Sequence, residues 1–250
     1  MKKRFWILWT ACMLIFAGSI YYYSAYMPKE ASNENISMAE TLTTKTEAII
    51  EETDEYKISV EYPKFIGVDG TIQANDIIFA DMNQSIANFK SLVTEMGNDK
   101  DIPITAKNEL LIKYEMMFQD NDMVSVKFEN FSYIRGSAHP FTEYSGFSYV
   151  FSTKKEVTLD DFFPQESNYL AKISERADVK LKIQLGDSYI DEFVKQGIEP
   201  KPENFKEFYL GKDGITFIFN TYQVAAYVAG PQFVFFPWSE IEDLLEISTQ

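Results

Sequence analysis

The sequence is short of the two residue types that most often bind metals or act in nucleophilic catalysis. Its 250 residues include one cysteine, Cys12, and one histidine, His139. One cysteine excludes an intrachain disulfide and a thiolate metal site, since both need at least two thiols. One histidine is too few for a clustered zinc site, and the chain has no nucleophile elbow, zinc-protease motif or phosphate-binding loop. We therefore expect no metal, no cofactor and no enzymatic activity.

Basic residues are also scarce. The chain has 23 Lys and Arg against 38 Asp and Glu, for a formal net charge of -15. Three of the basic residues lie before the first apolar run, so the part after Met27 carries 20 basic against 38 acidic residues, or -18. Binding to nucleic acid needs a basic face, which excludes nucleic acid as a partner. An acidic surface favours solubility and speeds encounter with a cationic partner.

Apolar residues, by contrast, are plentiful. Hydrophobic residues make up 46% of the chain, with 21 Phe and 15 Tyr, which is ample for a packed core. The first apolar run, residues 5–27, follows the positive flank Met1 to Arg4 and is long enough to span a bilayer with some tilt. Tyr residues at its distal end fit an interfacial belt.

Residues 1–27 thus fit a signal anchor, which would make the chain a single-pass protein of the cell membrane. They also fit a cleaved signal peptide, because Ala17-Gly-Ser19 offers small residues for cleavage, and the chain would then be secreted or periplasmic. Either interpretation places the bulk outside the cytoplasm. Residues 28–54 are rich in Glu, Thr, Ser and Asn and predict an acidic linker, with a weak helix over Thr41 to Glu52.

The remainder alternates between strand-like and helix-like patterns. An amphipathic helix is expected from Asn75 or Asp76 to Met96, with a buried stripe at spacings of three and four. Further helices are expected over 167–185 and 188–196, and a short one from Trp238. Period-two alternation predicts strands over Tyr56–Tyr62, Leu110–Phe118, Met123–Tyr133, Tyr144–Ser152, Ile215–Asn220 and Phe233–Phe236.

This order predicts an α+β fold, an antiparallel sheet meander covered by helices. Asp213-Gly214 is expected to form a hairpin turn with a positive φ at Gly214, so that Gly214→Val would destabilise the protein by about 1 kcal/mol or more. The strand over 215–220 is expected to be half-buried, because Phe217 and Phe219 alternate with polar or smaller residues.

Two loops combine small residues with polar-tipped side chains, as recognition loops do. One holds Ser137 and His139, and the other holds Tyr222 and Tyr227. We expect the two loops to lie side by side and these four residues to bind a ligand. Ser137 and His139 are two residues apart and need not face each other, so a catalytic pair is not expected. Asp160-Asp161 is expected to form a turn or a short helix cap.

Several motifs in sequence order resemble the domain of unknown function 3298. They are Gly136-Ser-Ala-His-Pro140, Leu159-Asp-Asp-Phe-Phe163, Asn204-Phe205 with Phe208 to Leu210 and Asp213-Gly214, and Tyr222-Gln-Val-Ala-Ala-Tyr-Val-Ala-Gly230-Pro231. The strand from Tyr56 to Pro63 and the helix behind it are similar to the usual N-terminal companion of that family, domain 4163. The resemblance implies a companion region over 55–140 and a 3298-like region over 141–250.

The resemblance implies a bacterial cell-envelope binding or sensing module. This pair of domains occurs in the extracellular part of the sigma-V anti-sigma factor, which binds lysozyme, and ahead of the catalytic domain of a peptidoglycan deacetylase. A cationic protein such as lysozyme, or peptidoglycan, is therefore the expected ligand. Sigma-factor control is not expected, since only four residues precede the apolar run. Many relatives have Ala-Pro-Tyr where this chain has Ala225-Ala226-Tyr227, a departure that bears on lysozyme as the specific ligand. The open alternatives are an envelope structural protein without a ligand and a hydrolase of cell-wall glycan.

Overall fold

The computed structural model describes residues 41–96, 107–164 and 167–245. The predicted anchor or signal segment, and the linker up to residue 40, lie outside the described residues. No helix within the described ranges combines the length and the apolar character that crossing a bilayer requires. The described part is one compact unit that begins at Thr41.

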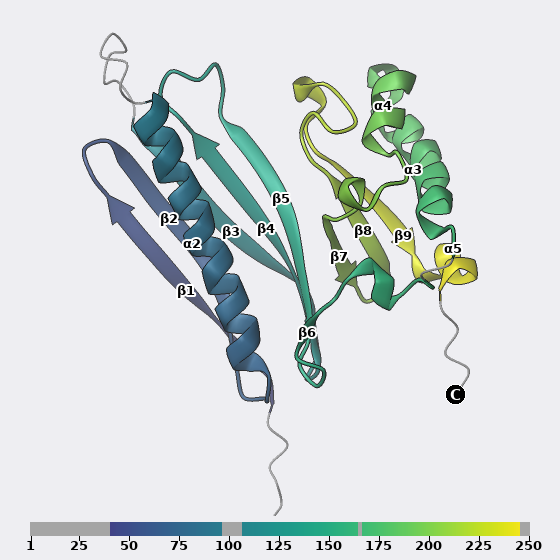
Figure 1. The fold of residues 1–250 in the computed structure, drawn as a ribbon, viewed down its shortest axis with the longest axis horizontal. Helices are drawn as coiled ribbons and strands as arrows, with labels where there is room; N and C mark the ends of the chain where they lie inside the picture. The colour runs from purple at the N-terminus through teal and green to yellow at the C-terminus, as the bar shows by residue number, and fades with distance from the viewer. Residues whose placement is uncertain (1–40, 97–106, 165–166, 246–250) are drawn as a thin grey trace, which may run out of the picture. The chain divides into compact units, whose positions relative to one another are not determined.

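Two sheets and a few helices make up the fold (Figure 1). The first sheet has the order β1-β2-β3-β4-β5-β6, with β1 (Thr43–Glu52), β2 (Tyr56–Ile66), β3 (Asn108–Gln119), β4 (Met123–Tyr133), β5 (Phe141–Val150) and β6 (Lys155–Glu156). The second has the order β7-β8-β9, with β7 (Phe208–Gly211), β8 (Gly214–Phe219) and β9 (Gln232–Pro237). The longer helices are α2 (Thr71–Met96), α3 (Tyr169–Leu185) and α4 (Asp191–Gly197). The prediction of a mixed α+β fold is confirmed.

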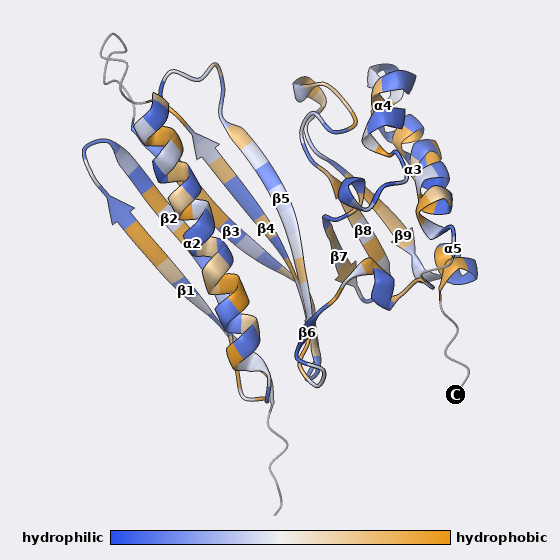
Figure 2. Cartoon of the chain, viewed as in Figure 1, coloured by the Kyte–Doolittle hydropathy of each residue, from blue (hydrophilic) through white to orange (hydrophobic). Residues whose placement is uncertain are grey.

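Helix α2 covers one face of the first sheet. Its predicted stripe is confirmed for five of its six residues: Ile78, Met82, Ile86, Phe89 and Val93 are buried, while Met96 at the end is 45% exposed. The stripe packs in one cluster with alternate residues of the central strands, such as Ile58, Val60 and Ile112. Figure 2 shows the resulting mixture of hydrophobic and hydrophilic residues around α2 and along the strands.

The weak helix predicted over Thr41 to Glu52 is wrong, because residues 43–52 form strand β1. This strand pairs antiparallel with β2 along its whole length, from Thr43↔Ile66 to Glu52↔Lys57. The segment is rich in the β-branched residues Thr and Ile, which favour strands once a neighbouring strand is available. The first described strand therefore lies inside the segment predicted to be a linker.

The first sheet is not a pure antiparallel meander, since β2 and β3 are parallel, from Tyr56↔Asn108 to Val60↔Ile112. Parallel neighbours need a crossover of a dozen residues or more, and the 26-residue helix α2 belongs to that crossover. The other strand pairs in this sheet are antiparallel, as expected. Beyond Val60, β2 has only β1 beside it, which lets the strand continue through Pro63.

Helix α3 covers the second sheet, and its buried residues are Tyr169, Ile173, Ala177, Leu181 and Leu185. They share a cluster with phenylalanines of the strands, among them Phe217 and Phe236. The half-buried strand predicted over 215–220 is wrong in one respect: every residue of β8 is buried, including Thr216. Both faces of this central strand are therefore covered.

Smaller elements complete this part: α5 (Trp238–Ile241) and the 3-10 turns η1 (Leu159–Asp161), η2 (Gly186–Ser188), η3 (Pro202–Asn204), η4 (Tyr227–Ala229) and η5 (Glu242–Leu244).

The two sheets meet where β7 lies against β4 and β5. Gly146 of β5 lets the two backbones approach closely, because a Cβ atom there would lie 1.5 Å from the carbonyl oxygen of Phe208. Beside it, the buried hydroxyls of Ser125 and Ser148 lie 2.8 Å apart, and the Leu210 amide donates a 2.8 Å hydrogen bond to Ser125 Oγ. Strand β5 begins at the division predicted after residue 140 and pairs with β4, so the first sheet continues across that division.

Gly214 does not have the positive φ that the sequence predicted, since the positive-φ glycines among the described residues are 67, 70, 136, 186 and 230. A glycine is required there for a different reason. A Cβ atom at Gly214 would lie 2.1 Å from the carbonyl oxygen of Phe236 in the neighbouring strand. Gly214→Val is still expected to lower the free energy of unfolding by about 1 kcal/mol or more, through overpacking between β8 and β9. An unchanged midpoint of urea unfolding would contradict this explanation.

The contact between the sheets gives a sharper prediction. Gly146→Ala should lower the free energy of unfolding by about 2 kcal/mol or more, because the methyl group forces β5 and β7 apart. Gly211→Ala is the matched control in β7, since its Cβ would meet only the Gly214 carbonyl oxygen at 3.7 Å. The control should change stability by about 0.5 kcal/mol or less. Urea unfolding of both variants checks this, and equal effects would show that the approach at Gly146 is not tightly constrained.

Candidate functional site

The two loops expected to bind a ligand do lie side by side. The first joins β4 to β5 and carries Ser137 and His139, and the second joins β8 to β9 and carries Tyr222 and Tyr227. The Tyr227 hydroxyl donates a 2.9 Å hydrogen bond to the carbonyl oxygen of Pro140 in the first loop. Loops from two different sheets thus form one surface.

Three aromatic side chains, His139, Tyr222 and Tyr227, form what we call the ring cluster. The rings of His139 and Tyr227 are stacked, with centroids 3.8 Å apart and planes 30° apart, and the Tyr222 ring lies 5.7 Å from that of Tyr227. Tyr222 is 50% exposed. Tyrosine rings of this kind provide rigid, amphipathic contact area at a low cost in conformational entropy.

Hydrogen bonds fix the tautomer of His139. Its Nδ1 lies 3.0 Å from the Pro140 carbonyl oxygen, which can only accept, so Nδ1 carries the proton. In the neutral ring Nε2 is then an acceptor, and the Tyr222 hydroxyl lies 3.5 Å from it. The imidazole therefore orients both tyrosines, one by stacking and one through its ring nitrogen.

Ser137 is not part of the ring cluster. Its hydroxyl donates to the carbonyl oxygens of Ile134 at 2.6 Å and of His139 at 3.2 Å, so it closes its own loop. Among the described residues, no hydrogen bond joins the Ser137 hydroxyl to the His139 imidazole. Of the four predicted residues, His139, Tyr222 and Tyr227 lie together, whereas the Ser137 side chain forms hydrogen bonds within its own loop.

The backbone of Tyr222 is unusual, since its φ of 71° lies in the left-handed region that favours glycine. A non-glycine residue in such a conformation costs about 1–3 kcal/mol, and such residues concentrate at functional sites. The surrounding bonds hold the conformation: the Gln223 amide donates to the Asn220 carbonyl at 2.9 Å, and the Asn220 amide donates to Gln223 Oε1 at 3.1 Å. An exposed ring is thus presented from a strained position.

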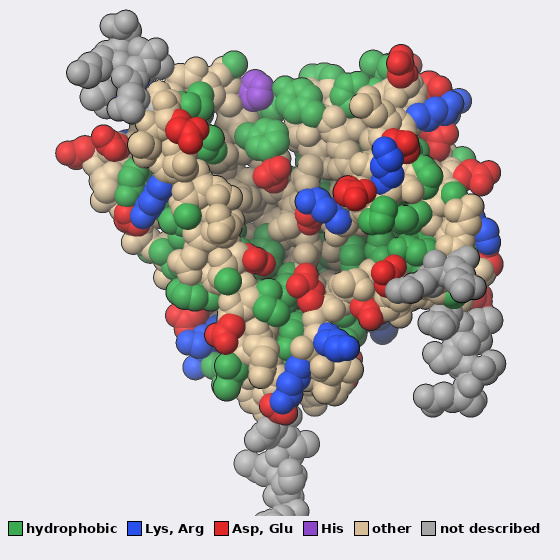
Figure 3. Space-filling view, viewed as in Figure 1, with side chains coloured by type: hydrophobic (Ala, Val, Ile, Leu, Met, Phe, Trp, Pro, Cys, Tyr) green, Lys and Arg blue, Asp and Glu red, His purple; other side chains and the backbone are tan. Residues whose placement is uncertain are grey.

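A polar cleft of about 410 Å³ begins next to the second loop. Side chains from both sheets, from α2 and from η3 line it, including Ser85, Asn130, Tyr144, Glu203 and Gln223. A further hollow of about 370 Å³ shares Ser85, Asn130 and Glu143 with it. Figure 3 shows this face of the molecule hollowed between the two sheets, with acidic side chains along the hollow.

Asn220 ties this cleft to the ring cluster. Its side-chain oxygen accepts from the Tyr144 amide at 2.7 Å, and its side-chain nitrogen donates to the Tyr144 carbonyl at 2.8 Å. Gln223 extends the network, because its side chain donates to the carbonyl oxygens of Gly197 and Asn204 at 3.1 Å and 2.9 Å. These two amides fix the start of the second loop against β5 and η3.

The cleft is acidic. Glu143, Glu203 and Glu207 line it, against one basic residue of the lining, Lys206. Burial raises the pKa of Glu207, although Lys206 and the Gly146 amide work in the opposite direction. Both oxygens of Glu207 are engaged, one with Lys206 Nζ at 3.5 Å and the other with the Gly146 amide at 3.3 Å. A cation or a neutral polyhydroxyl ligand fits this lining better than an anion does.

The sequence predicted the rings of this surface but not the cleft. Asn220 and Gln223, which line the cleft, lie on either side of Tyr222. Gln223 belongs to the motif from Tyr222 to Pro231 that resembles domain 3298, so the sequence contained a signal for this part of the cleft. The Asp160-Asp161 prediction is confirmed as a short-helix cap, because Asp161 Oδ2 accepts hydrogen bonds from the backbone amide and hydroxyl of Thr158, the residue before η1.

Comparison with known families assigns two segments of the chain. Residues 160–239 match the family described as "Protein of unknown function (DUF3298)", and residues 49–142 match the family described as "Deacetylase PdaC". The predicted resemblance to domain 3298 and its companion is therefore confirmed over these segments. Tyr222 and Tyr227 lie in the segment that matches DUF3298, and Ser137 and His139 lie in the segment that matches PdaC.

Two curated relatives match parts of the chain. Peptidoglycan-N-acetylmuramic acid deacetylase PdaC of Bacillus subtilis is 35% identical over 142 residues, which cover 57% of this chain and 30% of the deacetylase. Immunogenic protein MPT64 of Mycobacterium tuberculosis is 27% identical over 110 residues, which cover 44% of this chain and 47% of that protein. The chain thus spans less than half the length of either relative.

A solved structure shares the fold. A member of the DUF3298 family from Bacteroides fragilis superimposes with a TM-score of 0.59 at 16% identity, and the match covers 83% of this chain and 95% of that one. Both sheets described above therefore belong to a known arrangement.

The strained backbone at Tyr222 yields a prediction about stability. Tyr222→Gly should leave the free energy of unfolding within about 0.5 kcal/mol of its original value, because the relief of strain offsets the lost ring contacts. Tyr227→Gly is the matched comparison in the same loop. It should cost about 2 kcal/mol, since it removes a hydrogen bond and a stacked ring without relieving strain. Thermal and urea unfolding measure both, and a greater loss at Tyr222 would contradict the assignment of strain.

Proposed function

We propose that this chain is a non-enzymatic binding module of the bacterial cell envelope, acting outside the cytoplasm, and that its ligand is peptidoglycan. The observation that carries the proposal is the ring cluster, in which an exposed Tyr222 is held in a strained conformation beside a polar cleft. The similarity of residues 49–142 to a peptidoglycan deacetylase supports this ligand class. The apolar run at residues 5–27 would hold the module at the membrane.

The arrangement suits a glycan strand. Sugar rings present flat C–H faces that pack on aromatic side chains, and the exposed ring of Tyr222 offers such a face beside the cleft, whose lining includes Asn220 and Gln223. The hydroxyl groups of the glycan would be met by polar residues of the lining, such as Asn130, Ser145 and Glu143. Recognition by rigid aromatic residues with adaptable polar neighbours is common in binding loops.

The geometry favours binding over hydrolysis. A glycan hydrolase needs two carboxyl groups that face the scissile bond, one of them protonated near neutral pH. Burial raises the pKa of Glu207, yet both of its oxygens are already bound, one to Lys206 and one to the Gly146 amide. Its place in the fold is to join the two sheets.

A cationic protein such as lysozyme is the second candidate. The acidic lining of the cleft and the net charge of -15 favour it, because opposite charges speed association. The two candidates differ in their response to salt. Association with a cationic protein should weaken strongly between low and high ionic strength, whereas stacking on sugar rings should change little.

Binding of the full chain to purified peptidoglycan and to lysozyme, each at low and high salt, tests the proposal. We expect binding to peptidoglycan at both salt concentrations and a loss of about tenfold in Tyr222→Gly, since an aromatic anchor contributes about 1.4 kcal/mol or more. Phe235→Ala is the control, because Phe235 is another exposed ring, 46% exposed, on β9. It should bind like the original protein.

The results separate the candidates. Salt-sensitive binding to lysozyme without binding to peptidoglycan would transfer the proposal to a cationic protein. Release of sugar or acetate from peptidoglycan during the incubation would overturn the non-enzymatic part. Binding to neither ligand, or equal binding by Tyr222→Gly and the original protein, would remove the ring cluster as the binding surface.

A further inference from the structure

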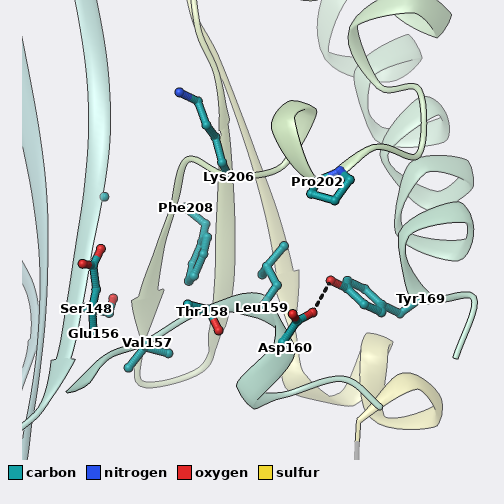
Figure 4. A pocket seen from close by; sticks show the side chains of 11 residues that line it. Ser148, Glu156, Val157, Thr158, Leu159, Asp160, Tyr169, Pro202, Lys206 and Phe208 are labelled. Atoms are coloured by element: carbon teal, nitrogen blue, oxygen red, sulfur yellow. Dashed lines mark hydrogen bonds between the residues drawn. The ribbon is translucent and has the colours of Figure 1, made fainter. Parts of the chain in front are cut away.

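A separate cavity of about 270 Å³ lies at the start of the C-terminal half, where it shares only Lys206 with the polar cleft. Figure 4 shows its surroundings: β5 on one side, η1 below, β7 in the middle and the start of α3 on the other side. This cavity plays no part in the proposed function, so the two can fail independently.

The walls of this cavity are largely apolar. Val157, Leu159, Pro202 and Phe208 line it together with the ring of Tyr169. Leu159, Phe208 and Tyr169 are themselves buried, so these walls belong to the core of the second sheet and are firmly placed. A surface of this kind accommodates methylene groups, whose transfer from water contributes about 0.8 kcal/mol each.

Charged groups stand around the apolar walls, and two of them have partners. Asp160 Oδ1 accepts a 3.1 Å hydrogen bond from the Tyr169 hydroxyl, and burial together with this carboxylate raises the pKa of Tyr169 to about 12. Lys206 Nζ lies 3.5 Å from Glu207 Oε1, and in Figure 4 its side chain points away from Asp160 and Tyr169.

Glu156 is different. Within the described part of the chain it makes no ion pair, and it lies on the two-residue strand β6 beside Ser148. Although the residue as a whole is exposed, partial burial of its carboxyl group raises its pKa, and the nearby Asp81 and Glu207 raise it further. A carboxylate so placed, among other acids and next to apolar walls, is stabilised by any cation that reaches it.

We infer that this cavity binds a primary ammonium group carried on a short aliphatic chain, with the ammonium on Glu156 and the methylenes against Leu159 and Phe208. The volume limits the ligand to a few heavy atoms, below the usual range of about 300–1,000 Å³ for drug-sized ligands. Amphipathic amines place an apolar stem on apolar surface and keep the charged head at the polar edge. A free alkylamine and a lysine side chain of a peptide share this chemistry.

A carboxylate ligand is the opposite possibility, with Lys206 as its anchor. The charge balance opposes it, since Glu156 and Asp160 both line the cavity and Lys206 is already paired with Glu207. An anion would also meet the repulsion that raises the pKa of Glu156. The sign of the ligand charge is therefore the first point that an experiment must decide.

Isothermal titration of the full chain with n-pentylamine, with pentanoate and with a lysine blocked at its α-amino and carboxyl groups tests the inference at near-neutral pH. We expect the amine to bind with a Kd of about 1 mM, as suits a ligand of so few atoms, and pentanoate to show no binding. Glu156→Gln should weaken amine binding about tenfold or more, because it removes the charge from the hydrogen bond. Glu192→Gln, an exposed acid on α4, is the matched control and should have no effect.

The blocked lysine identifies the source of the ammonium group. Binding comparable to that of pentylamine supports a peptide lysine as the ligand, and binding of the free amine alone supports a small amine. Binding of pentanoate in place of the amine, or no amine binding at millimolar concentration, would overturn the inference. Equal amine binding by Glu156→Gln and the original protein would also overturn it, and thermal unfolding of that variant verifies that it is folded.

Discussion

The candidate site depends on the close approach of two backbones, β5 at Gly146 and β7 at Phe208. The ring cluster is built from one loop of each sheet, so its geometry is set by how the sheets are held together. A glycine removes the side chain that would separate them, and the Ser125 hydroxyl, itself hydrogen-bonded to Ser148, accepts from the Leu210 amide that this contact buries. A buried amide without a hydrogen-bond partner would cost about 1–3 kcal/mol. Gly146 therefore permits the close approach, and the serine pair offsets the cost of the amide that the approach buries.

The same contact explains why binding loops and cleft occur together. Once β7 lies on the first sheet, Asn220 reaches Tyr144 and bonds both of its main-chain groups, much as a neighbouring strand would. The cleft is the space that remains between the sheets where their side chains do not fill it. Its acidic character follows from the composition of the chain, which has 23 basic residues against 38 acidic ones.

Most of the fold could be predicted from the sequence because its signals are local. The stripe of α2, the limits of β4 and the span of α3 all follow from periodicity within one element. The misses concern contacts between elements. Strand β1 exists because β2 lies beside it, β8 loses its exposed face because both sides are covered, and Gly214 is required by a neighbouring strand. The cleft was missed for the same reason, since its lining comes from segments between residues 85 and 223 that no local pattern connects.

The order of the elements along the chain has a consequence for biosynthesis. The first sheet ends at residue 156, so it can form while the second sheet is still being made. Until the second sheet forms, the face that carries Ser125 and Gly146 stays open to solvent, and the main-chain groups of Tyr144 lack their partner Asn220. An immature chain would therefore offer chaperones or proteases a surface that the finished protein hides. The ring cluster is complete only when Tyr227 packs against His139, so it requires both sheets to be in place.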